Sequence, residues 1–159
     1  MKDLAELVER LSSERPTDWT SLPDIELYRD QVLNYMKRQH SLQPEDSQLT
    51  GAMINNYIKS GLLPRANGKK YNKDHLVYLT AITSLKQVLS VGEIDYLLKH
   101  QPNLPDAEEF YADYLKQLDE AFLKTSDDLK ELNYCADTGQ LALLAMKLAV
   151  SAYAQKLAC

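Results

Sequence analysis

The strongest constraint in the sequence is the Asn67-Gly68 step, which lies between the segments 62–66 and 69–71. An Asn-Gly pair favours a two-residue β-turn, because both central residues of such a turn need positive φ angles. Elsewhere glycine is scarce, whereas leucine, alanine, lysine, glutamate and glutamine, which favour helices, are plentiful. We therefore expect a mainly helical fold with one small β-hairpin, formed by residues 62–66 and 69–71.

Helical patterns surround this hairpin on both sides. Apolar residues spaced by three and four predict helices that begin near residues 4, 24, 50, 72, 90, 106 and 137. Thr50 and Asn72 are suitable N-cap residues, and Gly61 is placed to end the third helix in a left-handed conformation. Two prolines predict a linker at 102–105. We expect an N-terminal helix and loop (1–21), a central domain (22–100) and a C-terminal helical part (106–159).

The charges are distributed unevenly along the chain. The net charge is −5, which taken alone argues against a nucleic-acid partner. However, residues 49–90 contain six basic groups and one acidic group, whereas residues 1–48 and 91–159 are both net acidic. A single positive block between two negative ones supports a local nucleic-acid contact.

The predicted helix that follows Thr50 has two different faces. Its inner face carries Met53, Ile54, Tyr57 and Ile58, which we expect to be buried. The outer face carries Gly51, Ala52, Asn55, Asn56 and Lys59. Small residues allow close approach to DNA, asparagine can pair with adenine, and lysine can reach guanine or phosphate. The alternative is that the two asparagines merely cover an exposed surface.

The order of the elements favours DNA binding over a plain exposed surface. A helix, a polar link, a short helix, a hairpin and another helix follow in the order of a winged helix-turn-helix, in which the hairpin reaches the neighbouring DNA backbone. The Tyr71 side chain could pack inward or donate its hydroxyl group to a phosphate. The candidate DNA-binding residues are Thr50, Ala52, Asn55, Asn56, Lys59, Arg65, Lys69, Lys70, Tyr71 and Lys73.

Three stretches carry a family resemblance: MINNYIKSGLLP (53–64), KKYNKDHLVYL (69–79) and LKQVLSVGEI (85–94). They resemble a bacterial family known as domain of unknown function 1836, over about residues 22–100. The resemblance implies a small cytoplasmic protein that acts as a transcriptional regulator.

Residues 50–98 are also similar to the MerR family, in which a recognition helix ends before a Gly-Leu-Leu-Pro sequence and a wing follows. This similarity implies a winged helix-turn-helix and a sequence-specific DNA-binding regulator. MerR proteins usually carry Arg and Tyr where this chain has Asn55 and Asn56. The bases that are read therefore cannot be carried over from that family.

The last predicted helix is apolar over most of its circumference, so other groups must surround it. It lies either at the centre of the chain's own bundle or against a second subunit, and we expect a homodimer through the C-terminal helices. An effector pocket beside the aromatic residues 110–122 is a further hypothesis, although such stripes usually form core. The two stripes are Leu141, Leu144, Ala145, Leu148 and Ala152, and Leu143, Met146, Val150, Tyr153 and Leu157.

The sequence offers little for other chemistry. Its three histidines and two cysteines lack the spacing of metal ligands, and His75 is expected to be a surface group or to face a phosphate. No phosphate-binding loop, nucleophile motif or carboxylate pair stands out, so we expect neither a cofactor nor an enzyme. With no signal peptide and no membrane span of about 20 apolar residues expected, the predicted location is cytoplasmic. The alternative function is a protein-interaction module that keeps the winged fold without binding DNA.

Overall fold

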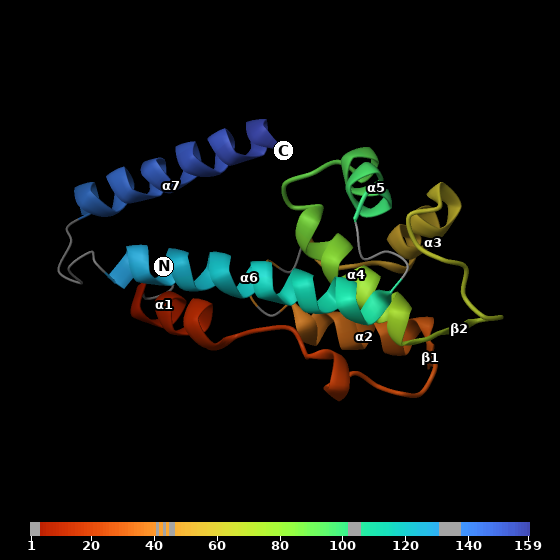
Figure 1. Cartoon of the computed structure of the whole chain (residues 1–159). Coiled ribbons are helices and arrows are strands. Elements are labelled where there is room, and N and C mark those ends of the chain that lie inside the picture. Colours follow the sequence, from red (N-terminus) through yellow and green to blue (C-terminus); the bar gives the residue numbers. More distant parts are fainter. Residues whose placement is uncertain (1–3, 41, 43, 45–46, 102–105, 131–137) are drawn as a thin grey trace. The chain divides into compact units, whose positions relative to one another are not determined.

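A computed structural model describes residues 4–40, 42, 44, 47–101, 106–130 and 138–159. As predicted, these residues form a mainly helical protein with one small antiparallel sheet (Figure 1). The chain forms two compact units, a larger one of residues 14–119 and a smaller one of residues up to 13 and from 120 onward. The division falls inside a long helix, whereas the predicted linker at 102–105 lies outside the described residues.

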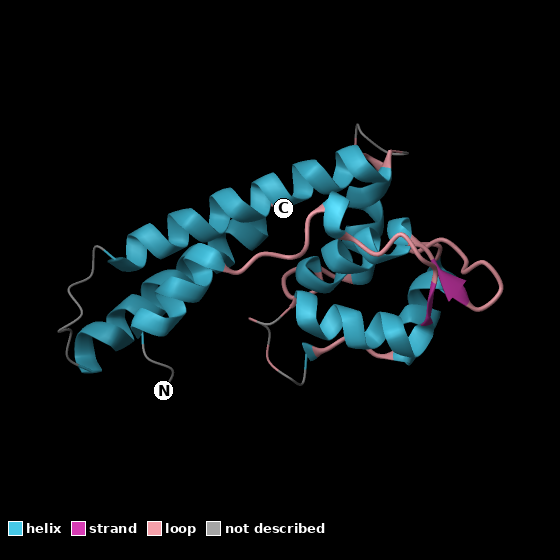
Figure 2. Ribbon diagram, turned by 90° about the horizontal axis from the view of Figure 1, so that it is seen from below, coloured by secondary structure: helices cyan, strands magenta, loops and turns pink. Residues whose placement is uncertain are grey.

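The larger unit contains the sheet and most of the helices. Leu27 lies opposite Tyr71, and Tyr28 opposite Lys70, in the strand pair that Figure 2 shows in magenta. Its elements are the short 3-10 helix η1 (Trp19–Ser21), β1 (Leu27–Tyr28), α2 (Arg29–Gln39), α3 (Gly51–Ser60), β2 (Lys70–Tyr71), α4 (Lys73–Leu85), α5 (Val91–Lys99) and the first part of α6 (Ala107–Lys130).

The hairpin differs from the prediction in its turn and in its partner strand. Asn67 and Lys70 exchange two backbone hydrogen bonds of 3.0 Å, so Gly68 and Lys69 are the turn residues. Gly68 has a φ of 62°, and among the described residues no non-glycine residue has a positive φ. Glycine in the first central position is typical of a type II′ turn. Residues 62–66 form no strand, and β2 pairs instead with β1, which the sequence pattern had placed inside a helix.

Helix α4 is the centre of the larger unit, because eight of its thirteen residues are buried. Helix α2 covers it with Val32 and Met36, and α3 with Ile54 and Tyr57. A helix that is buried on this many sides must be enclosed by other elements, which explains why α4 contacts both α2 and β2. The remaining members of this core include Ile94, Leu98, Phe110 and Tyr111.

Three aromatic residues of α6, Phe110, Tyr111 and Tyr114, also contribute to this core. Phe110 stacks on Tyr78, and Tyr111 is fully buried. The Tyr111 hydroxyl donates to the Thr17 carbonyl at 2.7 Å, and the Tyr114 hydroxyl donates to Ser84 at 2.8 Å. These aromatic side chains are therefore packing and anchoring groups of the larger unit.

The predicted helix ends are confirmed where the sequence carries cap residues. The Thr50 hydroxyl accepts from the Met53 backbone N–H, and the Asn72 side chain accepts from the backbone N–H of His75. Ser90 and Glu93 form the predicted reciprocal capping box. Gly61 ends α3 in a left-handed conformation, with a φ of 79°.

The smaller unit contains α1 (Leu4–Ser13), the end of α6 and α7 (Thr138–Ala158). Here Val8, Ser126 and Leu129 are buried, and the Ser126 hydroxyl lies 2.6 Å from that of Ser12. None of the residues of α7 is buried. Within the described structure, the enclosed helix is therefore α4 and not the last helix.

The left-handed glycine at the end of α3 gives a test of the fold. We expect Gly61→Ala to lower the free energy of unfolding by about 1 kcal/mol, because an alanine Cβ strains a positive φ. Gly92 is a matched control, since it lies in α5 without positive φ and with open space where a Cβ would lie. Gly92→Ala should be neutral or slightly stabilising in urea unfolding. Equal losses in the two variants would contradict this account of Gly61.

Candidate nucleic-acid interface

Helix α3 presents a polar face to solvent. Ala52, Asn55, Asn56 and Lys59 are exposed, and Gly51 is half-buried. On the opposite face Ile54 and Tyr57 are buried, while Met53 and Ile58 are partly buried and pack against the core. The predicted division of this helix into two faces is therefore confirmed. The core uses the apolar face, which leaves the two amides and the lysine available to a partner.

The segment from Gly61 to Tyr71, which we name the α3–β2 loop, has a fixed backbone conformation where it leaves α3. After the left-handed Gly61, the backbone N–H of Leu63 donates to the Tyr57 carbonyl at 3.1 Å. Leu62 and Leu63 are buried in the core. The loop is therefore fixed where it leaves α3, and after the buried Leu62 and Leu63 it becomes exposed again at residue 64.

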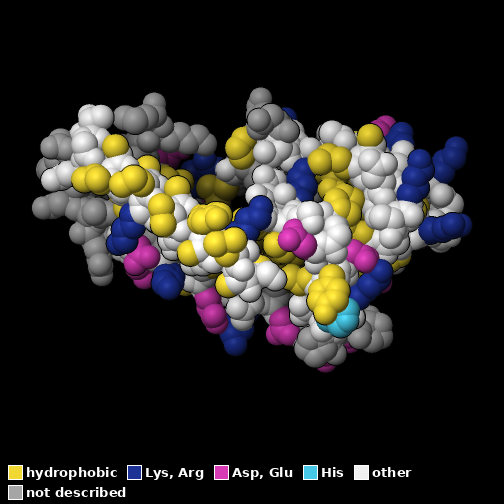
Figure 3. All heavy atoms as spheres, turned by 90° about the horizontal axis from the view of Figure 1, so that it is seen from above, with side chains coloured by type: hydrophobic (Ala, Val, Ile, Leu, Met, Phe, Trp, Pro, Cys, Tyr) yellow, Lys and Arg dark blue, Asp and Glu magenta, His cyan; other side chains and the backbone are white. Residues whose placement is uncertain are grey.

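The basic residues of this region are not equivalent. Arg65 and Lys69 are exposed, whereas Lys70 is half-buried, with its Nζ atom 5.6 Å from the ring centre of Tyr28. Figure 3 shows Lys and Arg side chains at the end of the larger unit that carries α3 and the α3–β2 loop. Arg65 and Lys69 are thus the loop cations that a partner can reach most directly.

Lys73 has ties within the larger unit. Its Nζ atom lies 3.0 Å from the carboxylate of Asp24 and 4.8 Å from the ring centre of Trp19. Another acidic residue, Glu26, accepts a hydrogen bond from the Asn67 amide at 3.2 Å. The segment before β1 therefore brings two carboxylates close to the basic loop, which reduces the positive potential there.

Tyr71 does not have the exposure that a phosphate contact needs. Its side chain is only 5% exposed and meets the His75 ring edge to face, with the ring centres 5.4 Å apart. Of the two predicted alternatives, the structure shows that the Tyr71 side chain packs inward, because the pairing of β2 with β1 directs it into the core. Tyr71 is therefore removed from the set of candidate DNA contacts.

His75 is a structural residue, and its expected surface position is wrong. The ring is 6% exposed, and its Nδ1 atom accepts from the backbone N–H of Asn72 at 3.2 Å. The other ring nitrogen, Nε2, can then donate to the Arg65 carbonyl at 3.3 Å. His75 thus ties the start of α4 to the middle of the α3–β2 loop, and so fixes the backbone that carries Arg65.

Arg29 belongs to this surface, although no sequence signal pointed to it. A Cβ atom built on Gly51 would lie 3.4 Å from the Cδ and Nε atoms of Arg29, so this side chain lies against the first turn of α3. Arg29 and Lys69 also line one open hollow of about 440 Å³, together with Asp30. Because residues 29 and 51 are distant in the sequence, only the fold brings this cation to the interface.

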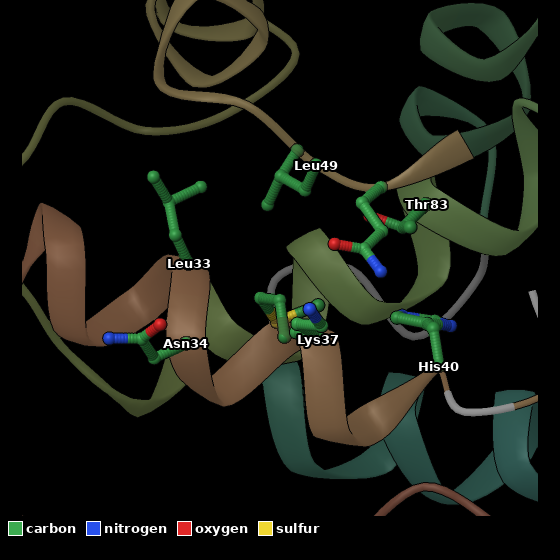
Figure 4. Close-up of a pocket in the computed structure, with 8 residues that line it drawn as sticks. Leu33, Asn34, Lys37, His40, Leu49 and Thr83 are labelled. Atoms are coloured by element: carbon green, nitrogen blue, oxygen red, sulfur yellow. The ribbon is translucent and has the colours of Figure 1, made fainter. Parts of the chain in front are cut away.

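A second hollow lies beside α2 and α4 (Figure 4). Its volume is about 130 Å³, well below the roughly 300–1,000 Å³ of typical small-molecule sites. Asn34, Lys37, His40 and Thr83 supply polar groups around it, and Leu33 and Leu49 supply apolar ones. Burial, and secondly the charge of Lys86, lower the pKa of His40 to about 4. The size of this hollow suits packing and water better than an organic effector.

No cluster of metal-ligating side chains occurs among the residues that the structure describes, and Cys135 lies outside them. The Cys159 thiol is exposed. The described part of the chain therefore gives no geometric basis for a metal centre.

The fold and this surface define a small helical protein with an exposed helix face beside a basic loop. The chain belongs to the family described as domain of unknown function (DUF1836), which matches residues 17–122. No curated protein and no solved structure matches the chain. The family resemblance is therefore confirmed, and the match covers the larger unit while leaving α7 outside it.

The lowered pKa of the half-buried His40 predicts a pH-dependent stability. Since the pKa of His40 falls from 6.5 to about 4 on folding, between these values the unfolded chain binds a proton that the folded chain does not. Stability should be full above pH 6.5 and fall towards pH 4, by on the order of 3 kcal/mol, as one pKa unit corresponds to about 1.4 kcal/mol. Urea unfolding at several pH values measures this loss.

The control for this prediction is His40→Gln, which keeps a polar side chain but cannot bind the proton. Its free energy of unfolding should change less between pH 6.5 and 4 than that of the parent chain. An identical pH dependence in the two proteins would assign the effect to other groups.

Proposed function

We propose that the larger unit is a winged helix-turn-helix that binds double-stranded DNA, and that the protein is a cytoplasmic, sequence-specific transcriptional regulator and not an enzyme. The observation that carries the proposal is the outer face of α3. Ala52, Asn55, Asn56 and Lys59 are all exposed on one helix, whose inner face is fixed in the core. Nothing in the packing of the described residues requires two adjacent amides there.

The dimensions of α3 fit this role. Its ten residues span about 15 Å, and a helix of ordinary diameter fits the major groove of B-DNA. Ala52 allows close approach, Asn55 and Asn56 can each form two hydrogen bonds with adenine, and Lys59 can reach guanine or phosphate. We assign base contacts to these residues. The Thr50 hydroxyl already caps α3 but can still donate to a phosphate.

The α3–β2 loop would act as the wing. Arg65 and Lys69 are exposed and lie on a backbone that β2 and His75 hold in place, so they suit phosphate contacts. Arg29 adds a third cation next to the first turn of α3. Lys70 and Lys73 have aromatic or carboxylate neighbours in the chain, so we assign them smaller contributions.

Two substitutions distinguish a residue that contacts the DNA backbone from a residue that contacts a base. We expect Lys69→Ala to weaken binding to all duplexes about equally and to reduce the salt dependence of binding by about one unit of slope, because it removes one phosphate contact. Asn55→Ala should cost about 1–3 kcal/mol at one base position and relax the preference there. Selection of bound duplexes from a random pool, followed by titrations at several salt concentrations, measures both effects.

Two controls accompany these variants. Lys116→Ala removes an exposed lysine from α6 and should leave DNA binding unchanged. Tyr71→Phe should also be neutral, because this side chain is buried. The proposal fails if no duplex is bound at low salt, or if Lys116→Ala weakens binding as much as Lys69→Ala.

The alternative function is docking to another protein through the same surface. The observation that favours it is the pair of carboxylates, Asp24 and Glu26, which contact Lys73 and Asn67 beside the loop. Such acidic groups oppose a DNA backbone but suit a mixed-charge protein interface. Specific capture of one stoichiometric protein partner, unaffected by the Lys69/Lys70 double alanine variant, together with no duplex binding, would support it.

A further inference from the structure

Helix α7 carries a regular apolar seam. Its members alternate in steps of three and four residues, which is the spacing of the a and d positions of a coiled-coil heptad. Each of these side chains is at least 59% exposed. Figure 3 shows a row of hydrophobic side chains along this helix. The seam consists of Leu143, Val150 and Leu157 at a, and Met146 and Tyr153 at d.

The opposite side of α7 carries a second apolar stripe, which is less exposed than the seam. Leu141 and Leu144 are only partly exposed, and Leu148, at 36%, is less exposed than any member of the seam. Leu144 and Leu148 line a groove that also includes Asp128 of α6 and, at its edge, Leu143 of the seam. At 100° per residue, this stripe and the seam lie on nearly opposite faces of the helix. The smaller unit therefore partly covers one stripe and leaves the seam open from Met146 to Leu157, while Leu143 lies at the edge of the groove.

We propose that the seam of α7 pairs with the seam of α7 from a second copy of this chain, as a two-helix coiled coil. A heptad seam complements a copy of itself, because its a and d side chains fit between those of an identical helix. Alanine residues at 142, 149 and 154 flank the seam and permit close approach, and α7 contains no acidic residue that would be buried beside it. The occupant is therefore another molecule of the same protein.

The size of the seam sets the strength of this contact. Five side chains of this kind bury roughly 300–600 Å² in each copy, from the usual areas of aliphatic and aromatic groups. Two copies together bury roughly 600–1,200 Å², which lies at or below the lower end of the roughly 1,200–2,000 Å² of stable interfaces. We therefore expect a dimer that dissociates on dilution, in the micromolar range.

A membrane is the other environment that α7 could suit, because among the described helices this one is long and apolar enough to cross a bilayer. However, Lys147 lies near the middle of the helix, and a charged centre disfavours insertion. Contact with lipid also does not require apolar residues that are spaced by three and four positions. These two features favour self-pairing over a bilayer.

The experiment uses the full chain in the absence of DNA, so its result is independent of the proposed DNA binding. Sedimentation equilibrium of the wild type should give a mass that rises towards twice 18.1 kDa with concentration. The double variant Met146→Glu/Val150→Glu should remain monomeric, and so should Met146→Lys/Val150→Lys. An equimolar mixture of the two should restore the dimer, because the introduced charges then attract whether the helices run parallel or antiparallel.

Ala145→Glu/Ala152→Glu is the matched control, since it adds the same charge to exposed positions that belong neither to the seam nor to the groove beside Asp128. It should dimerise like the wild type, and circular dichroism should show equal helix content in all variants. A wild type that is monomeric up to about 1 mM would overturn the proposal. So would dimerisation of either seam variant alone, or cosedimentation of the wild type, but not the seam variants, with phosphatidylcholine vesicles.

Discussion

The enclosure of α4 is the constraint on which the rest of the larger unit depends. This helix is buried on most of its circumference, so α2, α3, β2, α5 and α6 must supply apolar groups around it. Each covering element commits one face to that task and keeps the other free. The polar face of α3 is exposed for this reason, since Ile54 and Tyr57 fix how the helix is rotated about its axis.

The pairing of β1 with β2 adds a second constraint, and it has an electrostatic consequence. Pairing Leu27 with Tyr71 places the preceding segment beside the α3–β2 loop. That segment brings Asp24 and Glu26 close to basic and amide side chains of the loop region. The positive block seen in the sequence is thus partly balanced in three dimensions, and its exposed cations are Lys59, Arg65 and Lys69.

Much of the architecture could be predicted because its signals are local. Thr50, Asn72 and the Ser90–Glu93 box act within one helical turn, and the two faces of α3 follow from helical spacing alone. Features that depend on distant pairing were missed. Strand β1 has only two residues, too few for a periodic signal, and the Arg29 side chain comes close to the first turn of α3 only after folding. The burial of His75 could not be predicted because its ring is covered by a loop that lies ten residues away in the sequence.

Because the α3–β2 loop is held mainly through backbone groups, its exposed side chains can vary without changing the fold. The loop is held by the left-handed Gly61, by β2 and by the bond from His75 to the Arg65 carbonyl, none of which uses an exposed side chain. Residues such as Asn55, Arg65 and Lys69 can therefore be exchanged at little cost in folding. Single substitutions can therefore change the chemistry of this surface while the scaffold beneath it stays the same.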